Sequence, residues 1–253
     1  MARYVKYTKT ISTLIICLAL CYLLSLADSA MGSVFEYESG KPVLLGYLKA
    51  MGVPKQVLDV SRANQTEQQE TTDPETGRRT SLTYIYYDEY GKRYRSIEYA
   101  YGDPNTTHYT SYTEIYYDLA GNEIGKRVKE YTLYGGTIKQ TSDIVTVTIG
   151  GEEKTASVRR WEYVLAADGT TVIETRRLAE NYRTEGVDIG TISYSTEHLF
   201  DNSTGRLEDY RQAWYHTNGE ESRDVTYDYD DPNTTHYTAV ADTYYDADGN
   251  ETG

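Results

Sequence analysis

Two histidines, His108 and His236, are the residues whose surroundings invite a chemical role, because both stand in the same octapeptide. The octapeptide occurs as Asp103-Pro-Asn-Thr-Thr-His-Tyr-Thr110 and again as Asp231-Pro-Asn-Thr-Thr-His-Tyr-Thr238. An imidazole beside carboxylate and amide oxygens could hold a metal ion, and the oxygens would come from Asp103, Asn105, Asp231 and Asn233. This order is not a recognised ligand spacing, however, and Asp-Pro-Asn-Thr commonly begins a turn. We therefore favour a turn followed by a strand histidine with satisfied hydrogen bonds, with a metal site as the alternative.

A second possible cation site is the acidic stretch around the second octapeptide. Its oxygen ligands would come from Asp228, Asp230, Asp231 and Asn233. The first copy has Ala100 and Gly102 in place of the first two of these residues. The ligand order of an EF-hand, with its closing Glu, is also absent. We predict no metal-binding residue and no cofactor.

No catalytic constellation is recognisable in the sequence. No serine stands in a Gly-x-Ser-x-Gly context, no glycine-rich loop is suited to phosphate, and the two cysteines, Cys17 and Cys21, lie in an apolar N-terminal run. Carboxylates are abundant enough to include a glycosidase pair, but no spacing singles one out. We therefore predict that the protein is not an enzyme and has no catalytic residues.

The octapeptides belong to a longer internal repeat with an offset of 128 residues. Residues 86–125 and 214–253 are identical at 20 of 40 positions, and Asp73-x-x-Thr-Gly-Arg78 recurs upstream as Asp201-x-x-Thr-Gly-Arg206. This spacing predicts a first β-repeat unit over residues 73–200 and a second over residues 201–253. Because the second unit stops within a turn, we expect the sequence to be a fragment of a longer repeat array.

The elements that position these motifs are predicted to be strands. The chain has 28 Tyr against 2 Phe and 2 Trp, and tyrosine favours strands while its hydroxyl can stay in contact with water. Alternating patterns and intervening Gly, Asp-Gly and Asn-Gly turns predict strands over residues 83–87, 95–101, 108–117, 128–134, 144–149, 156–165, 171–178 and 189–199. The prediction is an all-β fold, an elongated antiparallel β-hairpin meander with a short N-terminal helical cap.

The turns between these strands share the pattern Tyr-Asp-x-x-Gly, in which Asp accepts hydrogen bonds from backbone amides and Gly supplies a positive φ. It occurs at Tyr87-Asp-Glu-Tyr-Gly91, Tyr117-Asp-Leu-Ala-Gly121 and Tyr245-Asp-Ala-Asp-Gly249. Together with Asp201-Asn-Ser-Thr-Gly-Arg-Leu207, it resembles the YD repeats of Rhs-type and teneurin-like exported proteins over about residues 73–253. The resemblance implies long β-hairpins that spiral into a sheet or hollow shell.

The N-terminal part differs in composition from the repeats. Residues 1–27 combine Arg3, Lys6 and Lys9 with an apolar run and small residues at its end, which predicts a signal peptide, with an uncleaved anchor as the alternative. Residues 28–72 are predicted to form a helical cap, centred on residues 41–63, and a polar linker; the loop character extends over residues 64–80. The expected location is extracellular or at the cell surface.

Charge limits the partners of the exported part. The chain has 39 acidic residues against 25 Lys and Arg, a net charge of −14, which disfavours nucleic acid and any membrane contact beyond the N-terminal segment. Tyrosine faces could form cross-strand ladders or could contact a glycan or protein surface. We predict an exported, non-enzymatic scaffold or adhesion-like interaction module, with a carbohydrate-binding module, or part of a secreted carbohydrate-active enzyme, as the alternative. Other copies or further repeats of the same array are further candidate partners.

Overall fold

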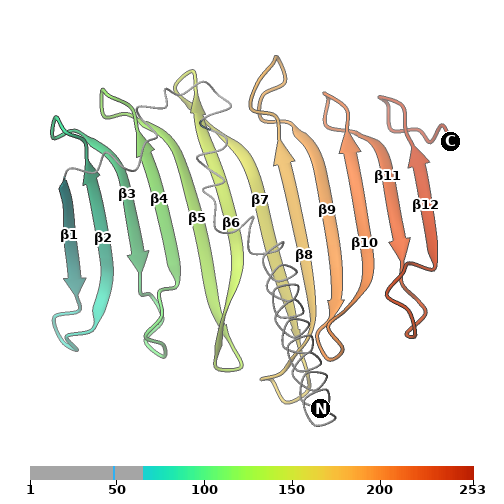
Figure 1. The fold of residues 1–253 in the computed structure, drawn as a ribbon, viewed down its shortest axis with the longest axis horizontal. Coiled ribbons are helices and arrows are strands. Elements are labelled where there is room, and N and C mark those ends of the chain that lie inside the picture. Colours follow the sequence, from blue (N-terminus) through green and yellow to red (C-terminus); the bar gives the residue numbers. More distant parts are fainter. Residues whose placement is uncertain (1–47, 49–64) are drawn as a thin grey trace, which may run out of the picture. The chain divides into compact units, whose positions relative to one another are not determined.

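The computed structural model describes Leu48 and residues 65–253, and residues 65–253 form one antiparallel sheet whose strand order follows the chain (Figure 1). Its twelve strands are β1 Gln65–Thr72, β2 Arg79–Tyr87, β3 Arg93–Ala100, β4 Ser111–Tyr117, β5 Glu123–Tyr134, β6 Thr137–Ile149, β7 Glu152–Leu165, β8 Val172–Tyr182, β9 Ile192–Asp201, β10 Arg206–Tyr215, β11 Glu221–Asp228 and β12 Ala239–Tyr244. The predicted all-β meander of hairpins is confirmed. The boundary expected between residues 200 and 201 falls inside β9, and the sheet continues across it without interruption.

The predicted signal peptide over residues 1–27 lies outside the described residues. So does the predicted helical cap over residues 41–63, apart from Leu48, which is helical and buried. Within the part of the chain that the structure describes, no helix has the length and apolarity needed to span a bilayer.

A polar linker or loop was predicted over residues 64–80, and this prediction was wrong for residues 65–72, which form strand β1. β1 pairs with β2 along its whole length, and a tight turn at residues 73–78 joins the two. The polar sequence of β1 misled the prediction, because a strand at the side of a single sheet can expose polar side chains. These side chains bond across to β2: the Tyr87 hydroxyl donates to Glu67 Oε2 at 2.8 Å, and Arg79 Nη2 donates to Glu70 Oε2 at 2.9 Å.

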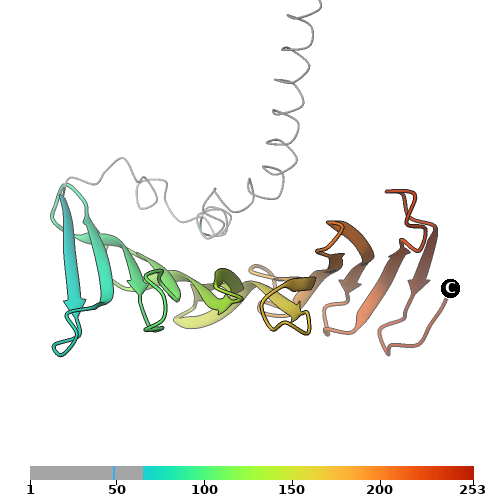
Figure 2. The ribbon, with the colours of Figure 1, turned by 90° about the horizontal axis from the view of Figure 1, so that it is seen from below.

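One face of the sheet carries a ladder of tyrosines. Successive side chains of a strand point to opposite faces, so residues paired in register share a face. Tyr99 and Tyr112 are paired between β3 and β4, with ring centroids 5.5 Å apart, and Tyr210 and Tyr227 are paired between β10 and β11 at the same distance. Such cross-strand aromatic pairs stabilise this sheet, on which no second sheet packs within the described residues (Figure 2).

Most of the buried side chains of the sheet lie in strands β3–β7, and they include ion pairs. Tyr116, Val145 and Val147 are essentially inaccessible to solvent. On the same face, Arg127 forms two hydrogen bonds with Asp143, Nε to Oδ1 at 2.8 Å and Nη2 to Oδ2 at 2.7 Å. The core of the sheet is therefore part apolar and part ionic.

The predicted turn chemistry is confirmed at the Tyr-Asp-x-x-Gly sequences. Asp118 Oδ1 accepts hydrogen bonds from the amides of Ala120 and Asn122, both at 2.8 Å, and Gly121 has a φ of 90°. These bonds lower the pKa of the Asp118 carboxyl, with the Asn122 side chain as the largest cause. The Tyr117 ring packs across to β3, where the Arg93 guanidinium lies 4.2 Å from its centroid.

Candidate functional site

In each copy, the Asp-x-x-Thr-Gly-Arg turn and the octapeptide lie next to each other at the same end of the strands. That end of the strands is called an edge of the sheet below. Since the strands alternate in direction, the connections that follow odd-numbered strands all lie on the same edge (Figure 1). The Asp73-x-x-Thr-Gly-Arg78 turn joins β1 to β2, and the first octapeptide forms the next connection on that edge, between β3 and β4. The second copies stand in the same relation, after β9 and after β11. The meander therefore brings each copied turn next to a copied loop.

An arginine joins each turn to its loop. Arg78 Nη2 donates to the carbonyl oxygen of Tyr101 at 3.0 Å and also to that of Asp103. In the second copy, Arg206 Nη2 donates to the carbonyl oxygens of Tyr229 and Asp231. A planar guanidinium with several N–H donors is suited to hold two carbonyls at once. The sequence showed the repeated arginine but gave no sign of these contacts, which join residues 23 and 25 positions apart.

Hydrogen bonds inside the octapeptide confirm the predicted turn. Asp103 Oδ1 accepts bonds from the Asn105 amide at 2.8 Å and from Asn105 Nδ2 at 3.0 Å. Asp231 and Asn233 repeat both bonds, at 2.9 and 3.0 Å, and the bonds from Asn233 lower the pKa of the Asp231 carboxyl. Both aspartates thus accept a hydrogen bond from a backbone amide of their own turn and stabilise that turn.

The prediction of a strand histidine was wrong in both copies. β4 begins at Ser111 and β12 at Ala239, so His108 and His236 lie in the loop before the strand, and both are exposed. The backbone of the turn extends as far as the histidine. The His108 amide donates to the Thr106 hydroxyl at 3.1 Å, and the His236 amide donates to the Thr234 hydroxyl at 3.0 Å. Neither imidazole bonds to another described residue.

No metal centre is assembled from the described residues. None of their His, Cys, Asp and Glu side chains form a group of three or more that could hold a metal ion. The four residues considered for calcium, Asp228, Asp230, Asp231 and Asn233, are spread over the end of β11 and the loop that follows it. The Asp231 carboxylate accepts the hydrogen bonds of its own turn, and these bonds account for its orientation.

Each octapeptide borders a pocket beneath the arginine-held loop. The first pocket has a volume of about 320 Å³ and is lined by Arg78, Arg79, Tyr101, Pro104, Asn105, Thr106 and Thr107. The second has a volume of about 470 Å³ and is lined by Thr204, Gly205, Arg206, Leu207, Tyr229, Pro232, Asn233, Thr234 and Thr235. All seven lining positions of the first pocket recur in the second at the offset of 128, and six of the seven residues are identical. Where they differ, Arg79 is replaced by Leu207.

Aromatic contacts attach both loops to the tyrosine ladder. Tyr109 packs edge-on against Tyr99, with centroids 5.0 Å apart and an interplanar angle of 67°. Tyr237 packs against Tyr227 with nearly the same geometry, at 5.3 Å and 69°. The tyrosines that line the pockets, Tyr101 and Tyr229, are half-buried. The two sites therefore agree in backbone, anchoring arginine and ring packing.

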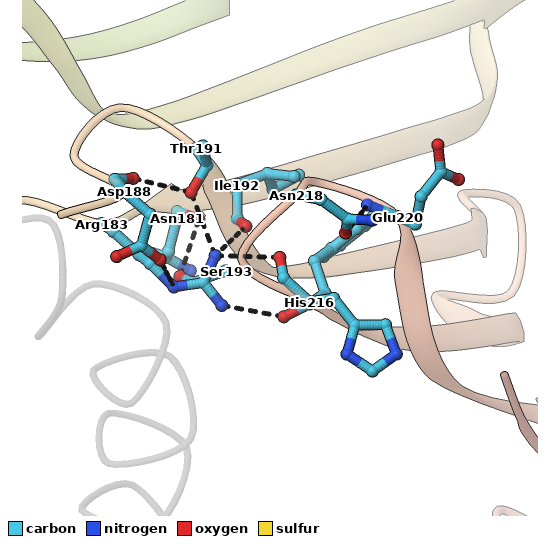
Figure 3. A network of polar contacts seen from close by, with 10 residues as sticks. Asn181, Arg183, Asp188, Thr191, Ile192, Ser193, His216, Asn218 and Glu220 are labelled. Atoms are coloured by element: carbon cyan, nitrogen blue, oxygen red, sulfur yellow. Dashed lines mark hydrogen bonds and ion pairs between the residues drawn. The ribbon is translucent and has the colours of Figure 1, made fainter. Parts of the chain in front are cut away.

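A comparable arginine joins connections on the opposite edge. Arg183 donates to the carbonyl oxygens of Ile192 at 2.8 Å, Tyr215 at 2.8 Å and His216 at 3.2 Å, and its Nε pairs with Asp188 Oδ2 at 2.9 Å (Figure 3). It links the β8–β9 connection to the β10–β11 turn. Unlike Arg78 and Arg206, Arg183 has no arginine counterpart at the offset of 128, so this network holds turns together without belonging to the copied site.

No protein-family model matches the chain, and no curated protein matches it. Among solved structures, the chain matches a protein of unknown function from Bacteroides fragilis NCTC 9343. The two sequences are 10% identical, the match covers 76% of this chain and 100% of that one, and the TM-score is 0.17. A likeness at this level supports no conclusion about either function. The resemblance to YD repeats stays a prediction.

Proposed function

We propose that this protein is an exported, non-enzymatic scaffold that presents a repeated recognition site to a partner outside the cell. The observation that supports the proposal is the duplicated pocket, which stands twice on one edge of a continuous sheet with six of seven lining residues unchanged. A binding site gains from duplication, because a partner held at two points dissociates more slowly than one held at a single point. A catalytic site gains no comparable advantage.

The sequence supports the remaining parts of the proposal. Residues 1–27 have the composition of a signal peptide, which would place the sheet outside the cytoplasm. The net charge of −14 disfavours nucleic acid and anionic membranes as partners. A glycan, a protein surface and other copies or further repeats of the same array are the partners that this chemistry allows.

A binding assay with a turnover control tests this function. The full chain would be applied to immobilised polysaccharides and to an array of extracellular proteins, and the products would be analysed for cleavage. We expect retention of at least one partner without release of shortened products. Hydrolysis of a polysaccharide, abolished by substituting one pair of carboxylates, would refute the proposal and favour the carbohydrate-active enzyme.

A further inference from the structure

Two residues of the copied loop have no role in building it. Thr107 and His108, like Thr235 and His236 in the second copy, are exposed, and their side chains bond to no other described residue. The other residues of the octapeptide form its turn, its side-chain caps or its ring contact. Meanwhile the strands that follow have diverged, with Tyr112 replaced by a valine and Ile115 by a threonine in the second copy. Folding alone does not explain why the two free residues are unchanged.

Apart from one arginine, the residues shared by the two pockets are uncharged, and one of them is aromatic. The rings of Tyr101 and Pro104 are apolar, while Asn105, Thr106 and Thr107 offer amide and hydroxyl groups, and no carboxylate lines either pocket within the described part of the chain. A pyranose ring matches this combination, because its C–H face packs on an aromatic ring and its hydroxyls form hydrogen bonds.

The cations at the site do not point to an anionic ligand. The arginine common to both pockets already holds two backbone carbonyls, and Arg79 of the first pocket is paired with Glu70 and lies over the ring of Tyr101 at 5.7 Å. In the second pocket a leucine replaces Arg79. A positive charge at that position is therefore not common to both sites, which favours an uncharged ligand.

The placement of the pockets suits one long ligand. They lie at the β3–β4 and β11–β12 connections, eight strand spacings apart on the same edge. At about 4.8 Å per spacing, the separation along the sheet is roughly 38 Å. Both volumes lie at the small end of the range of about 300–1,000 Å³ for ligand pockets. We propose that the two pockets bind two segments of one neutral polysaccharide; this rests on the proposed function and specifies its partner.

The experiment uses the full chain with pocket-blocking variants. Thr107→Leu and Thr235→Leu each add bulk and remove a hydroxyl at a pocket wall, at positions whose side chains make no bond in the described structure. Thr217→Leu is the matched control, since Thr217 is also an exposed turn threonine and lies on the opposite edge. Binding would be measured by calorimetry with neutral glucans, mannans, galactans and xylans, together with short oligosaccharides from the best binder.

We expect two short oligosaccharides to bind per chain, and one in each single variant. On the long polymer, blocking one pocket should weaken binding by at least tenfold, because a bivalent contact becomes monovalent. Blocking both should abolish binding, and the control should bind like the parent. Equal binding by parent and double variant, preference for charged glycans, or no binding of any neutral glycan would refute the inference. In those cases capture of another extracellular partner without turnover would leave the proposed function standing.

Discussion

The buried ion pair between Arg127 and Asp143 gives a quantitative test of what stabilises this sheet. Both side chains are at most 6% exposed, and two hydrogen bonds of 2.7 and 2.8 Å join them. Burial by itself would lower the pKa of Arg127, but the hydrogen bonds that it donates to Asp143 and the negative charge of that carboxylate raise the pKa overall. Asp143→Ala leaves a buried guanidinium without its partner, so we expect the free energy of unfolding to fall by about 3–5 kcal/mol.

Urea unfolding followed by far-UV circular dichroism would measure this loss, and the chain supplies a matched control. Arg223 and Asp242 form the same two-bond contact across β11 and β12, at 2.9 and 2.8 Å, but their side chains are 38% and 39% exposed. Asp242→Ala should change stability little, because water can solvate the remaining guanidinium. The double variant Arg127→Met/Asp143→Leu should recover most of the stability. Equal losses in the two aspartate variants would refute the role assigned to burial.

Three further perturbations test the turns, the buried histidine and the loop anchor. Gly135→Ala should destabilise the protein more than Gly136→Ala in the same turn: both glycines have a positive φ, but a Cβ on Gly135 would lie 1.8 Å from the Thr170 carbonyl oxygen, and urea midpoints would rank the two variants. Burial, followed by the charge of Arg177, lowers the pKa of His198 to about 4 in the folded state, so its contribution to stability is complete above its unfolded pKa of about 6.5 and is lost as the pH falls towards 4. A shift of this size corresponds to about 3 kcal/mol, and solvent screening at the partly exposed ring reduces the expected loss of stability to about 1–2 kcal/mol. The loss should be absent in His198→Gln, and urea unfolding across that pH range would measure it. Arg78→Lys should leave the sheet folded but speed amide hydrogen exchange in the first loop, because an ammonium group lacks the fork that holds both carbonyls.

The sequence was sufficient for those parts of the fold that depend on local chemistry. A turn such as Asp118-Leu-Ala-Gly121 closes through bonds within five residues, and alternation along a strand reports its own two faces. β1 was missed because its Gln, Thr and Glu residues resemble a loop in isolation. Its strand conformation comes from pairing with β2, and that pairing is a property of two segments together.

The candidate site was predictable only in its parts. Repetition identified the octapeptide and the arginine turn separately, and the turn chemistry of Asp103 could be read from the sequence. The pocket depends on hydrogen bonds from Arg78 to carbonyl oxygens of the next connection on the same edge. No local sequence pattern predicts these contacts. The histidine drew attention because imidazole is chemically versatile, yet in the structure it stands outside both the strand and any cluster of ligands.

Within the described residues no second sheet packs on this one, and contacts between neighbouring connections restrain the loops that border the two copied pockets. Along both edges, a side chain from one connection donates to a backbone carbonyl of the next: Arg78, Arg183 and Arg206 do so, as do Lys92 to Leu119 at 2.8 Å and Asn218 to Ala247 at 2.7 Å. Sheet hydrogen bonds set the distance between strands, and these side chains restrict how far each loop can move from its neighbour. Because a bivalent ligand gains affinity only when both sites are held at a separation it can span, the same contacts that stabilise the edges would also preserve the advantage of a duplicated pocket.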